Sequence, residues 1–454
     1  ATGCLASHKA QAVMASCART SKPCRSGQTG MRPFGSLGPQ IDVSGYAEQL
    51  DAKVAVVKQT MAAAIPVSVL QAAAIFPTTP TGHRCRAGPF AVRPGSASDG
   101  STLELAMWDA IAKDHSVVRA HAVPIYAAPI AAAMEALRTL PIFTDVDNSN
   151  YETNDVFSSS WGAVVGHGLR SVQFHSTLTH ELLVCFIYHD KRLKSRRRNE
   201  KLQGEEQASA EWEAAAKILR SALQDAMAAS GVETRVDITG RWKRRRLVVE
   251  RDYVVERLNL SNGRTLTYRQ PEGQFSNPNA QCEIRCLEWL CDQASQIAST
   301  CGQEPVHLLE LHCGGGNNTV ALAPYFARVH AVEINRVLAE AAEENLRIND
   351  IHNVQLERAP SAMANLARSA AATAQAVLVD PPRSGLDAET LQLVSGFKHV
   401  LYISCNPCAL VSDLLALDES HESVAVAIFD MFPYTTHAEC AVRLRQRPSK
   451  QRMP

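Results

Sequence analysis

The sequence predicts an α/β protein in which a doubly wound parallel sheet follows a mixed α+β domain. The chain has 454 residues, which exceeds what a single hydrophobic core usually organises. After about residue 270, apolar strand patterns alternate with helical patterns, whereas the preceding region mixes them less regularly. We therefore expect a leader at 1–40, a mixed α+β domain at 41–270 and a doubly wound domain at 271–454.

The mixed domain is predicted from two helical patterns and several β-rich runs. Apolar residues at helical spacing predict helices over 46–64 and 205–230. Strands are predicted over 181–189, 233–239 and 247–255. The segment 145–168 is polar and rich in Ser and Asn, so we expect an insertion or a long loop there.

Two basic runs lie in this domain, although the formal charge of the whole chain cancels, with 46 basic and 46 acidic residues. The first run spans 191–201 and includes Arg196, Arg197 and Arg198, and the second spans 241–246. An isolated run of this kind is most simply a solvated loop. Two runs upstream of a second domain favour contacts with the phosphates of a nucleic acid.

The doubly wound domain is predicted from seven apolar strands. They lie at 306–312, 329–334, 353–357, 376–379, 399–404, 424–431 and 440–444. Helical patterns separate most of them, which implies a parallel sheet with helices on both faces. Ligands bind such a sheet beyond the carboxyl ends of its strands, and the residues with reactive side chains fall at these ends.

A glycine-rich loop follows the first of these strands, as Cys313-Gly314-Gly315-Gly316-Asn317. Its glycines let the backbone approach a ligand, and the loop opens a helix whose amino end attracts polar groups. Glu333 ends the next strand, 19 residues after Gly314, where a carboxylate can accept hydrogen bonds from both hydroxyls of a ribose. These two signals fit NAD as well as S-adenosylmethionine.

Later parts of the sequence separate these two cofactors. Asp380-Pro381-Pro382-Arg383 follows the fourth strand, Ser404-Cys405-Asn406-Pro407 ends the fifth, and Glu439 precedes the last. A cysteine nucleophile, a base-reading loop and a late carboxylate suit a methyltransferase that acts on a pyrimidine, and a dehydrogenase has no use for them. We therefore expect S-adenosylmethionine as the cofactor.

These residues resemble the tRNA (uracil-5-)-methyltransferase family, in particular the bacterial type that acts on the T-loop uridine at tRNA position 54. The resemblance covers about 46–445 and is strongest in 309–314, 380–386, 401–407 and 429–439. It implies a Rossmann-like methyltransferase domain preceded by an RNA-binding domain, with tRNA as the substrate. We expect the protein to be a monomer.

By this resemblance, Cys405 is the nucleophile and Glu439 is the base. A thiolate that attacks C6 of uracil makes C5 electron-rich enough to accept a methyl group. Because a free thiol has a pKa of about 8.5 and is mostly protonated at neutral pH, we expect the site to lower the pKa of Cys405. Once C5 carries both a proton and the methyl group, a base must remove the proton before the thiol is eliminated.

The resemblance also implies contacts with the cofactor, from Asn277, His312, Gly314, Asn317, Glu333 and Asp380. Asn277 stands where the family has Gln, and His312 stands where it usually has Tyr, so these two departures bear on cofactor affinity. Asp380 is also expected to face the substrate. Arg383 and Arg86 are expected to contact the RNA.

Composition narrows the class of protein further. Residues 1–41 contain no Asp or Glu, which fits an organellar transit peptide or a disordered leader. We expect an intracellular protein, in the cytoplasm or in an organelle. No apolar run approaches the roughly 20 residues that span a bilayer. The 13 cysteines are irregularly placed, so we expect reduced thiols without a metal site or an iron–sulfur cluster.

Two alternative functions stay open. The first is uridine methylation in another RNA, such as organellar ribosomal RNA, because substrate choice lies in the less recognisable first half of the chain. The second is a tRNA-binding chaperone with weak or lost catalysis, which would fit the departures at Asn277 and His312. The retained Cys405 and Glu439 argue against a chaperone.

Overall fold

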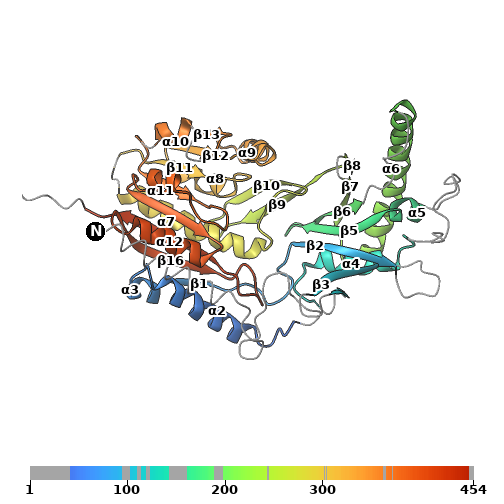
Figure 1. Cartoon of the computed structure of the whole chain (residues 1–454), viewed down its shortest axis with the longest axis horizontal. Helices are drawn as coiled ribbons and strands as arrows, with labels where there is room; N and C mark the ends of the chain where they lie inside the picture. Colours follow the sequence, from blue (N-terminus) through green and yellow to red (C-terminus); the bar gives the residue numbers. More distant parts are fainter. Residues whose placement is uncertain are drawn as a thin grey trace, which may run out of the picture.

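The computed structural model describes residues 41–94, 103–109, 114–118, 123–142, 161–188, 198–242, 245–300, 302, 304–360, 365–370 and 372–448. The predicted leader, most of the segment 145–168 and most of the basic run 191–201 lie outside these residues. The described chain forms two large sheets, and the hairpin β9–β10 lies between them (Figure 1).

The C-terminal sheet has eight strands in the order β1-β16-β17-β15-β14-β11-β12-β13. Seven of them are β11 (His307–Leu311), β12 (Arg328–Val332), β13 (Val354–Glu357), β14 (Ala376–Val379), β15 (His399–Ser404), β16 (His421–Phe429) and β17 (Glu439–Gln446). These are the seven strands predicted from the sequence. Only β17 departs from the expected parallel arrangement, since it runs antiparallel to both β15 and β16. Its connection from β16 is too short for the crossover of a dozen or more residues that parallel strands need.

Helices cover both faces of this sheet, as expected for a doubly wound fold. They are α7 (Ala280–Thr300), α8 (Asn317–Leu322), the 3-10 helix η3 (Ala323–Tyr325), α9 (Arg336–Ile348), α10 (Asn365–Ala370), α11 (Ala388–Val394) and α12 (Pro407–Leu417). Leu308 packs in the core that contains Leu287 of α7, whereas its neighbour Leu309 packs with Leu410 of α12. Because adjacent residues of β11 enter different cores, the strand is buried on both sides.

The N-terminal part of the described chain also belongs to the C-terminal sheet. Helix α2 (Tyr46–Met61) buries Val57 and Met61 in the core beside α12. After α3 (Val67–Gln71), strand β1 (Ala74–Phe76) pairs in parallel with β16. The range 41–270, predicted as one domain, therefore contributes its first elements to the sheet of 271–454.

The second sheet has seven strands in the order β4-β3-β2-β5-β6-β7-β8. They are β2 (Arg86–Pro94), β3 (Leu103–Asp109), β4 (Asp114–Val117), β5 (Leu169–Ser176), β6 (Glu181–Tyr188), β7 (Arg235–Trp242) and β8 (Arg245–Val249). Its helices are α4 (Ala128–Thr139), α5 (Trp161–Gly166) and α6 (Arg198–Ala229). Adjacent strands are antiparallel except β6 and β7, which are parallel because α6 crosses between them.

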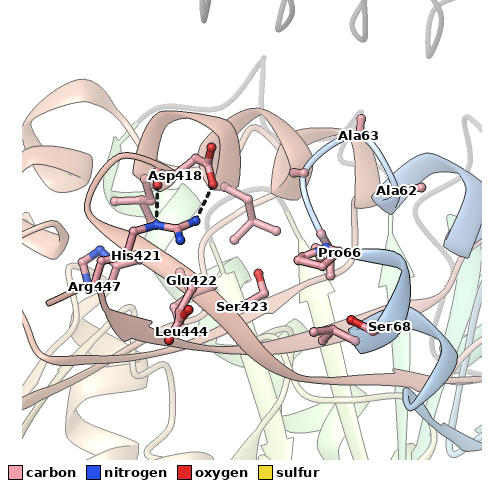
Figure 2. A pocket seen from close by; sticks show the side chains of 15 residues that line it. Ala62, Ala63, Pro66, Ser68, Asp418, His421, Glu422, Ser423, Leu444 and Arg447 are labelled. Atoms are coloured by element: carbon pink, nitrogen blue, oxygen red, sulfur yellow. Dashed lines mark hydrogen bonds and ion pairs between the residues drawn. The ribbon is translucent and has the colours of Figure 1, made fainter.

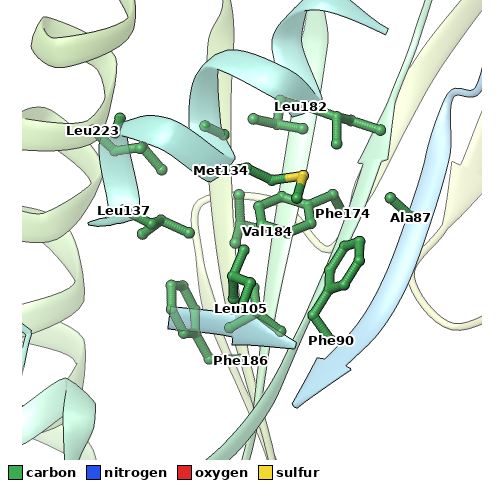
Figure 3. Packing of buried hydrophobic residues seen from close by; sticks show 14 of the residues in the cluster. Ala87, Phe90, Leu105, Met134, Leu137, Phe174, Leu182, Val184, Phe186 and Leu223 are labelled. Atoms are coloured by element: carbon green, nitrogen blue, oxygen red, sulfur yellow. The ribbon is translucent and has the colours of Figure 1, made fainter. Parts of the chain in front are cut away.

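The core of this sheet lies between its strands and the helices α4 and α6. Figure 3 shows Phe90, Leu105 and Phe174 of the sheet near Met134 of α4, with Leu223 of α6 to the left. Side chains of this size contribute about 1.5–3 kcal/mol each when they are fully buried. This core holds β2, β5 and β6 together, and β6 packs against β9 of the hairpin.

The range 247–255, predicted as one strand, contains parts of two. Strand β8 ends at Val249, and Glu250 has a φ of 68°, which breaks the extended backbone. Strand β9 (Tyr253–Asn259) then pairs with β10 (Thr265–Pro271). Leu266 and Tyr268 of β10 are buried in the core that contains α7, so the hairpin is anchored on the C-terminal sheet.

Candidate active site

The carboxyl ends of four adjacent parallel strands gather most of the predicted site residues. The strands β15, β14, β11 and β12 are neighbours in the sheet. His312 follows β11, Glu333 follows β12, and Asp380 follows β14. Cys405 follows β15, so these side chains lie along one edge of the sheet, as the sequence predicted.

Cys405 and Glu439 are neighbours because of the antiparallel register of β15 and β17. Ser404, the last residue of β15, pairs with Cys440. Because the two strands are antiparallel, Cys405, which follows Ser404, lies beside Glu439, which precedes Cys440. Both side chains are half-buried and thus open to the surface at this edge. A nucleophile and a base therefore stand together, although they are far apart in the chain.

The pKa of Cys405 is raised, contrary to the lowering that we predicted. Burial is the main cause, and the nearby Glu439 carboxyl adds to it. The Arg383 guanidinium acts in the opposite direction but does not outweigh them. A negative group beside a thiol disfavours the thiolate, which the sequence motif alone does not reveal.

Three carboxyl groups of the site, from Asp380, Glu439 and Glu283, influence one another. Burial raises the pKa of Asp380. Burial and then Asp380 raise the pKa of Glu439 well above its usual range, while Arg383 lowers it. Burial raises the pKa of Glu283 to about 7, and Asp380 contributes. Neighbouring carboxylates repel one another, so these three carboxyl groups do not all ionise together. The cluster therefore retains protons near neutral pH.

The glycine-rich loop makes a tight turn between β11 and α8. Gly316 has a φ of 78°, and a Cβ atom there would lie 3.2 Å from the Cβ of Ala342 in α9. Only glycine therefore permits both the backbone conformation and the close approach of the two elements. His312 also has a positive φ, of 62°, which turns the chain out of β11 into the loop.

Glu333 is fixed by two backbone N–H groups. Its Oε2 accepts a hydrogen bond from the N–H of Gly314 at 2.9 Å, and its Oε1 accepts one from the N–H of Asn335 at 2.7 Å. A carboxylate has about four acceptor positions, so both oxygens keep capacity for further donors. This donor set fits the two hydroxyls of a ribose beside the glycine-rich loop.

Asn277 and Asn317 converge on Glu283, a residue that the sequence reasoning missed. Nδ2 of Asn277 donates to Oε1 of Glu283 at 2.8 Å, and Nδ2 of Asn317 donates to the same oxygen. Glu283 lies on α7 and is 3% exposed. The available signal was its spacing, because it precedes the core residues Leu287 and Leu290 by four and seven positions.

The two arginines predicted to contact RNA differ in their surroundings. Arg383 is exposed, and its carbonyl oxygen accepts a hydrogen bond from Nδ2 of Asn406 at 2.9 Å, which ties its loop to the loop of Cys405. Nη1 of Arg86 instead donates to the carbonyl oxygens of Gln274 at 2.7 Å and Ser276 at 3.3 Å. Arg86 thus supports the segment before Asn277, and its contact with RNA stays a prediction.

Two described members of the second basic run, Arg241 and Arg246, are engaged by acidic side chains. Nη1 of Arg241 lies 3.0 Å from Oε1 of Glu272. Arg246 pairs with Asp252 and lies 3.6 Å from Oε2 of Glu272. These ion pairs offset part of the positive charge that the sequence pattern assigns to phosphate contacts.

The model of the tRNA (uracil-5-)-methyltransferase family matches residues 45–447. The chain belongs to this family. It is 35% identical to a tRNA/tmRNA (uracil-C(5))-methyltransferase from Aromatoleum aromaticum, over 90% of this chain and 98% of the relative. A protein of the same name from Shewanella amazonensis is 32% identical, over 90% and 99% of the two chains.

The fold is similar to that of a solved methyltransferase. That structure is the Pyrococcus abyssi tRNA (uracil-54, C5)-methyltransferase in complex with S-adenosyl-L-homocysteine. The TM-score is 0.58 at 16% identity, with 92% of this chain and 87% of that chain covered. The predicted fold class, enzyme class and methyl donor, S-adenosylmethionine, are confirmed by these comparisons. The relatives named from Aromatoleum and Shewanella are bacterial and do not test an organellar location.

A cavity of about 440 Å³ lies at the other edge of the methyltransferase sheet. Figure 2 shows it between Pro66 and Ser68 on one side and His421 on the other, with the ion pair of Asp418 and Arg447 at its rim. Because β16 begins at His421 and runs parallel to β15, this cavity is at the amino ends of the strands. It is separate from the site of Cys405.

Neither a metal site nor a membrane span is found in the part of the chain that the structure describes. Within those residues, no cluster of three or more His, Cys, Asp or Glu side chains could hold a metal ion. No helix there has the length and apolar composition needed to cross a bilayer.

Proposed function

We propose that this enzyme methylates C5 of the T-loop uridine at position 54 of tRNA through a transient bond between Sγ of Cys405 and C6 of the base. The observation that carries the proposal is the placement of Cys405 beside Glu439 at the strand edge that also holds Asp380. The named relatives support tRNA as the substrate, and the Pyrococcus protein is named for uracil-54.

Cys405 acts first in the proposed reaction. Its thiolate adds to C6 of the uracil, and the electron pair of the C5–C6 double bond moves toward C5 and O4. S-adenosylmethionine supplies the methyl group that C5 accepts. Asp380 at the neighbouring strand end is suited to receive the N–H of the uracil ring, since a carboxylate is an acceptor.

Glu439 completes the proposed reaction. Its carboxylate removes the proton from C5, the C5–C6 double bond re-forms, and the bond from C6 to Sγ breaks to return Cys405 as a thiolate. A carboxyl group with a raised pKa is a stronger base once it is ionised. Arg383, which lowers the pKa of both Glu439 and Cys405, favours the two ionised forms that this sequence needs.

The site geometry supports the proposed cofactor contacts. Glu333 accepts the ribose hydroxyls, and the loop from Gly314 to Gly316 approaches the donor with its backbone. Asn277 and Asn317 flank the amino end of α8, where polar groups of the donor are attracted. These roles agree with the contacts that the resemblance implies.

The proposal is tested by locating the methyl group on RNA. Full-length tRNA is incubated with the enzyme and labelled S-adenosylmethionine, digested, and mapped by mass spectrometry of the fragments. We expect label on uridine 54 and none on a tRNA in which cytidine replaces that uridine. The Cys405→Ala variant, with retained tRNA binding, should give no label on either RNA.

The same experiment separates the alternatives. Transfer-messenger RNA is included because the bacterial relatives are named for both substrates, and ribosomal RNA is included as the competing substrate. Label confined to ribosomal RNA would overturn the tRNA proposal. Binding of tRNA without any label, by a protein that binds the methyl donor, would favour the chaperone.

A further inference from the structure

Glu283 is a buried carboxyl group to which the proposed reaction assigns no step. It lies in the first turn of α7, and its backbone N–H donates to the carbonyl oxygen of Asn279 at 3.0 Å. Oδ1 of Asn279 accepts a hydrogen bond from the N–H of Cys282 at 3.1 Å, which fixes the start of the helix. The side chain of Glu283 therefore has a defined position beside the methyl-donor loop.

The hydrogen bonds of Glu283 determine how two amide groups are oriented. Asn277 and Asn317 each use Nδ2 to donate to its Oε1. Among the described residues, no group donates a hydrogen bond to Oδ1 of Asn277 or of Asn317. Neither Oδ1 atom is among the buried polar atoms that lack a partner. Both carbonyl oxygens are thus available to a donor group that enters the site. An Asn side chain can turn either its NH2 group or its carbonyl oxygen toward a neighbour. An acceptor such as Oε1 of Glu283 selects the orientation in which the NH2 group points toward it.

We propose that Glu283 is a positioning residue for the methyl donor: it holds Nδ2 of Asn277 and Asn317 so that both carbonyl oxygens face the ammonium group of the donor. The inference rests on the proposed roles of Asn277 and Asn317 as donor contacts. An ammonium group has three N–H donors and no acceptor, so two carbonyl oxygens beside a carboxylate match it.

The arrangement also accounts for the short side chain of Asn277. Asn has one methylene less than the Gln that the resemblance implies at this position. In this chain Glu283 meets the amide of Asn277 at 2.8 Å, so the shorter side chain is still anchored. We therefore infer that Asn277 and Glu283 work as a pair.

The charge of Glu283 depends on the groups that face it. These are Asp380 after β14, Glu439 at the start of β17, Glu256 on β9, Tyr268 on β10, Cys85 before β2, and Cys282 and Cys286 on α7. Burial and Asp380 raise the pKa of Glu283 to about 7, so part of the carboxyl population is protonated at neutral pH. A cation favours the ionised form, and its binding therefore releases protons. The affinity for the donor should rise as the pH increases through 7.

The test measures donor binding to the full-length protein without RNA, so that no turnover occurs. Calorimetric titrations with S-adenosylmethionine in two buffers of different ionisation enthalpy give both the affinity and the number of protons released. For Glu283→Gln we expect about tenfold weaker binding, fewer released protons and a flatter pH dependence between 6 and 8. The loss should be similar with S-adenosylhomocysteine, which keeps the ammonium group and lacks only the sulfonium charge.

A matched control is Asp292→Asn, which removes a carboxylate from an exposed position of the same helix. It should leave affinity and proton release unchanged. If Glu283→Gln also leaves both unchanged while Asn317→Ala weakens binding, Glu283 has no positioning role and the proposed donor site stands. If Asn317→Ala has no effect either, the proposed donor contacts fail.

A second variant keeps the inference testable if Glu283→Gln does not fold. Glu283→Asp retains the negative charge and shortens the reach by one methylene. We expect it to bind the donor more weakly but still to release protons, because the charge remains while the contact with the amides is lost. Unchanged affinity in the Asp variant would overturn the inference.

Discussion

At the scale of residues, the register of β15 and β17 places the proposed nucleophile, Cys405, beside the proposed base, Glu439. The sequence motifs identified both residues, and the pairing of Ser404 with Cys440 explains why they meet. The motifs could not predict the pKa values of these two side chains. The raised pKa values of Cys405 and Glu283 depend on burial and on Asp380, and that of Cys405 depends also on Glu439. These carboxyl groups come from other parts of the chain, so no local pattern contains them.

Replacement of the base should stop the proposed reaction after methyl transfer. In Glu439→Gln, the proton on C5 has no acceptor, so the bond between Cys405 and C6 of the RNA persists. We expect a protein–RNA adduct that migrates slowly in a denaturing gel and carries the labelled methyl group. The double variant with Cys405→Ala is the control and should show no such band. Normal product release from Glu439→Gln would remove Glu439 from the role of base.

The rate at which the enzyme releases methylated tRNA should rise with pH through the neutral range. The nucleophile and the base both act in their ionised forms, and the pKa of each group is raised, so the ionised forms are scarce at low pH. Arg383 lowers both pKa values, so Arg383→Gln should move the rise in rate to higher pH. Single-turnover rates at saturating tRNA, measured between pH 6 and 9, check both statements. A rate independent of pH in the unaltered enzyme would contradict them.

At the scale of elements, the strand and helix patterns predicted most of the C-terminal sheet, and the exceptions have physical causes. Periodicity reports burial but not direction, so it could not show that β17 runs antiparallel. It also could not show that β1 joins a sheet formed mainly by later residues. Helix α2 was predicted, but the contact of its Lys53 with the loop before Glu439 was not.

Lys53 connects helix α2 to the loop between β16 and β17. Its Nζ lies 2.6 Å from Oδ1 of Asp430 and donates to the carbonyl oxygen of Phe432 at 2.8 Å. The hydroxyl of Tyr46 donates to the other oxygen of Asp430 at 2.9 Å. Because this loop leads into Glu439, the buried pair stabilises the segment that places the base.

We therefore expect Lys53→Met to destabilise the protein by about 3–5 kcal/mol, because it leaves the Asp430 carboxylate buried without its cation. Denaturation by urea measures the change. Lys58→Met on the same helix is the control and should change stability by less than about 1 kcal/mol. A similar effect of the two substitutions would show that the pair with Asp430 contributes little.

At the scale of the whole molecule, the balanced formal charge means that tRNA binding depends on where the positive charges lie. The mixed sheet, with its long helix α6, lies beyond the hairpin β9–β10 from the methyltransferase sheet (Figure 1). Arg241 and Arg246 are held by acidic neighbours. The first basic run, which falls largely outside the described residues, is thus the stronger candidate for phosphate contacts.

Salt dependence should distinguish the two basic runs. Replacement of Arg196, Arg197 and Arg198 by Gln should weaken tRNA binding and reduce the slope of log affinity against log salt by about one per lost phosphate contact. Replacement of Arg246 by Gln should change the slope little, since its charge is already paired with Asp252. Filter binding at several salt concentrations gives both slopes. An unchanged slope in the first variant would make its run a solvated loop.

The pairing of β1 with β16 also constrains how the chain folds during synthesis. Ala74 of β1 pairs with Ala427 of β16, so the edge of the sheet is completed only after nearly all of the polypeptide has left the ribosome. Until then, the apolar residues of α2 and β1 lack their partners, and contacts so distant in sequence form slowly. Nascent chains that stop before β16 should consequently be prone to aggregate.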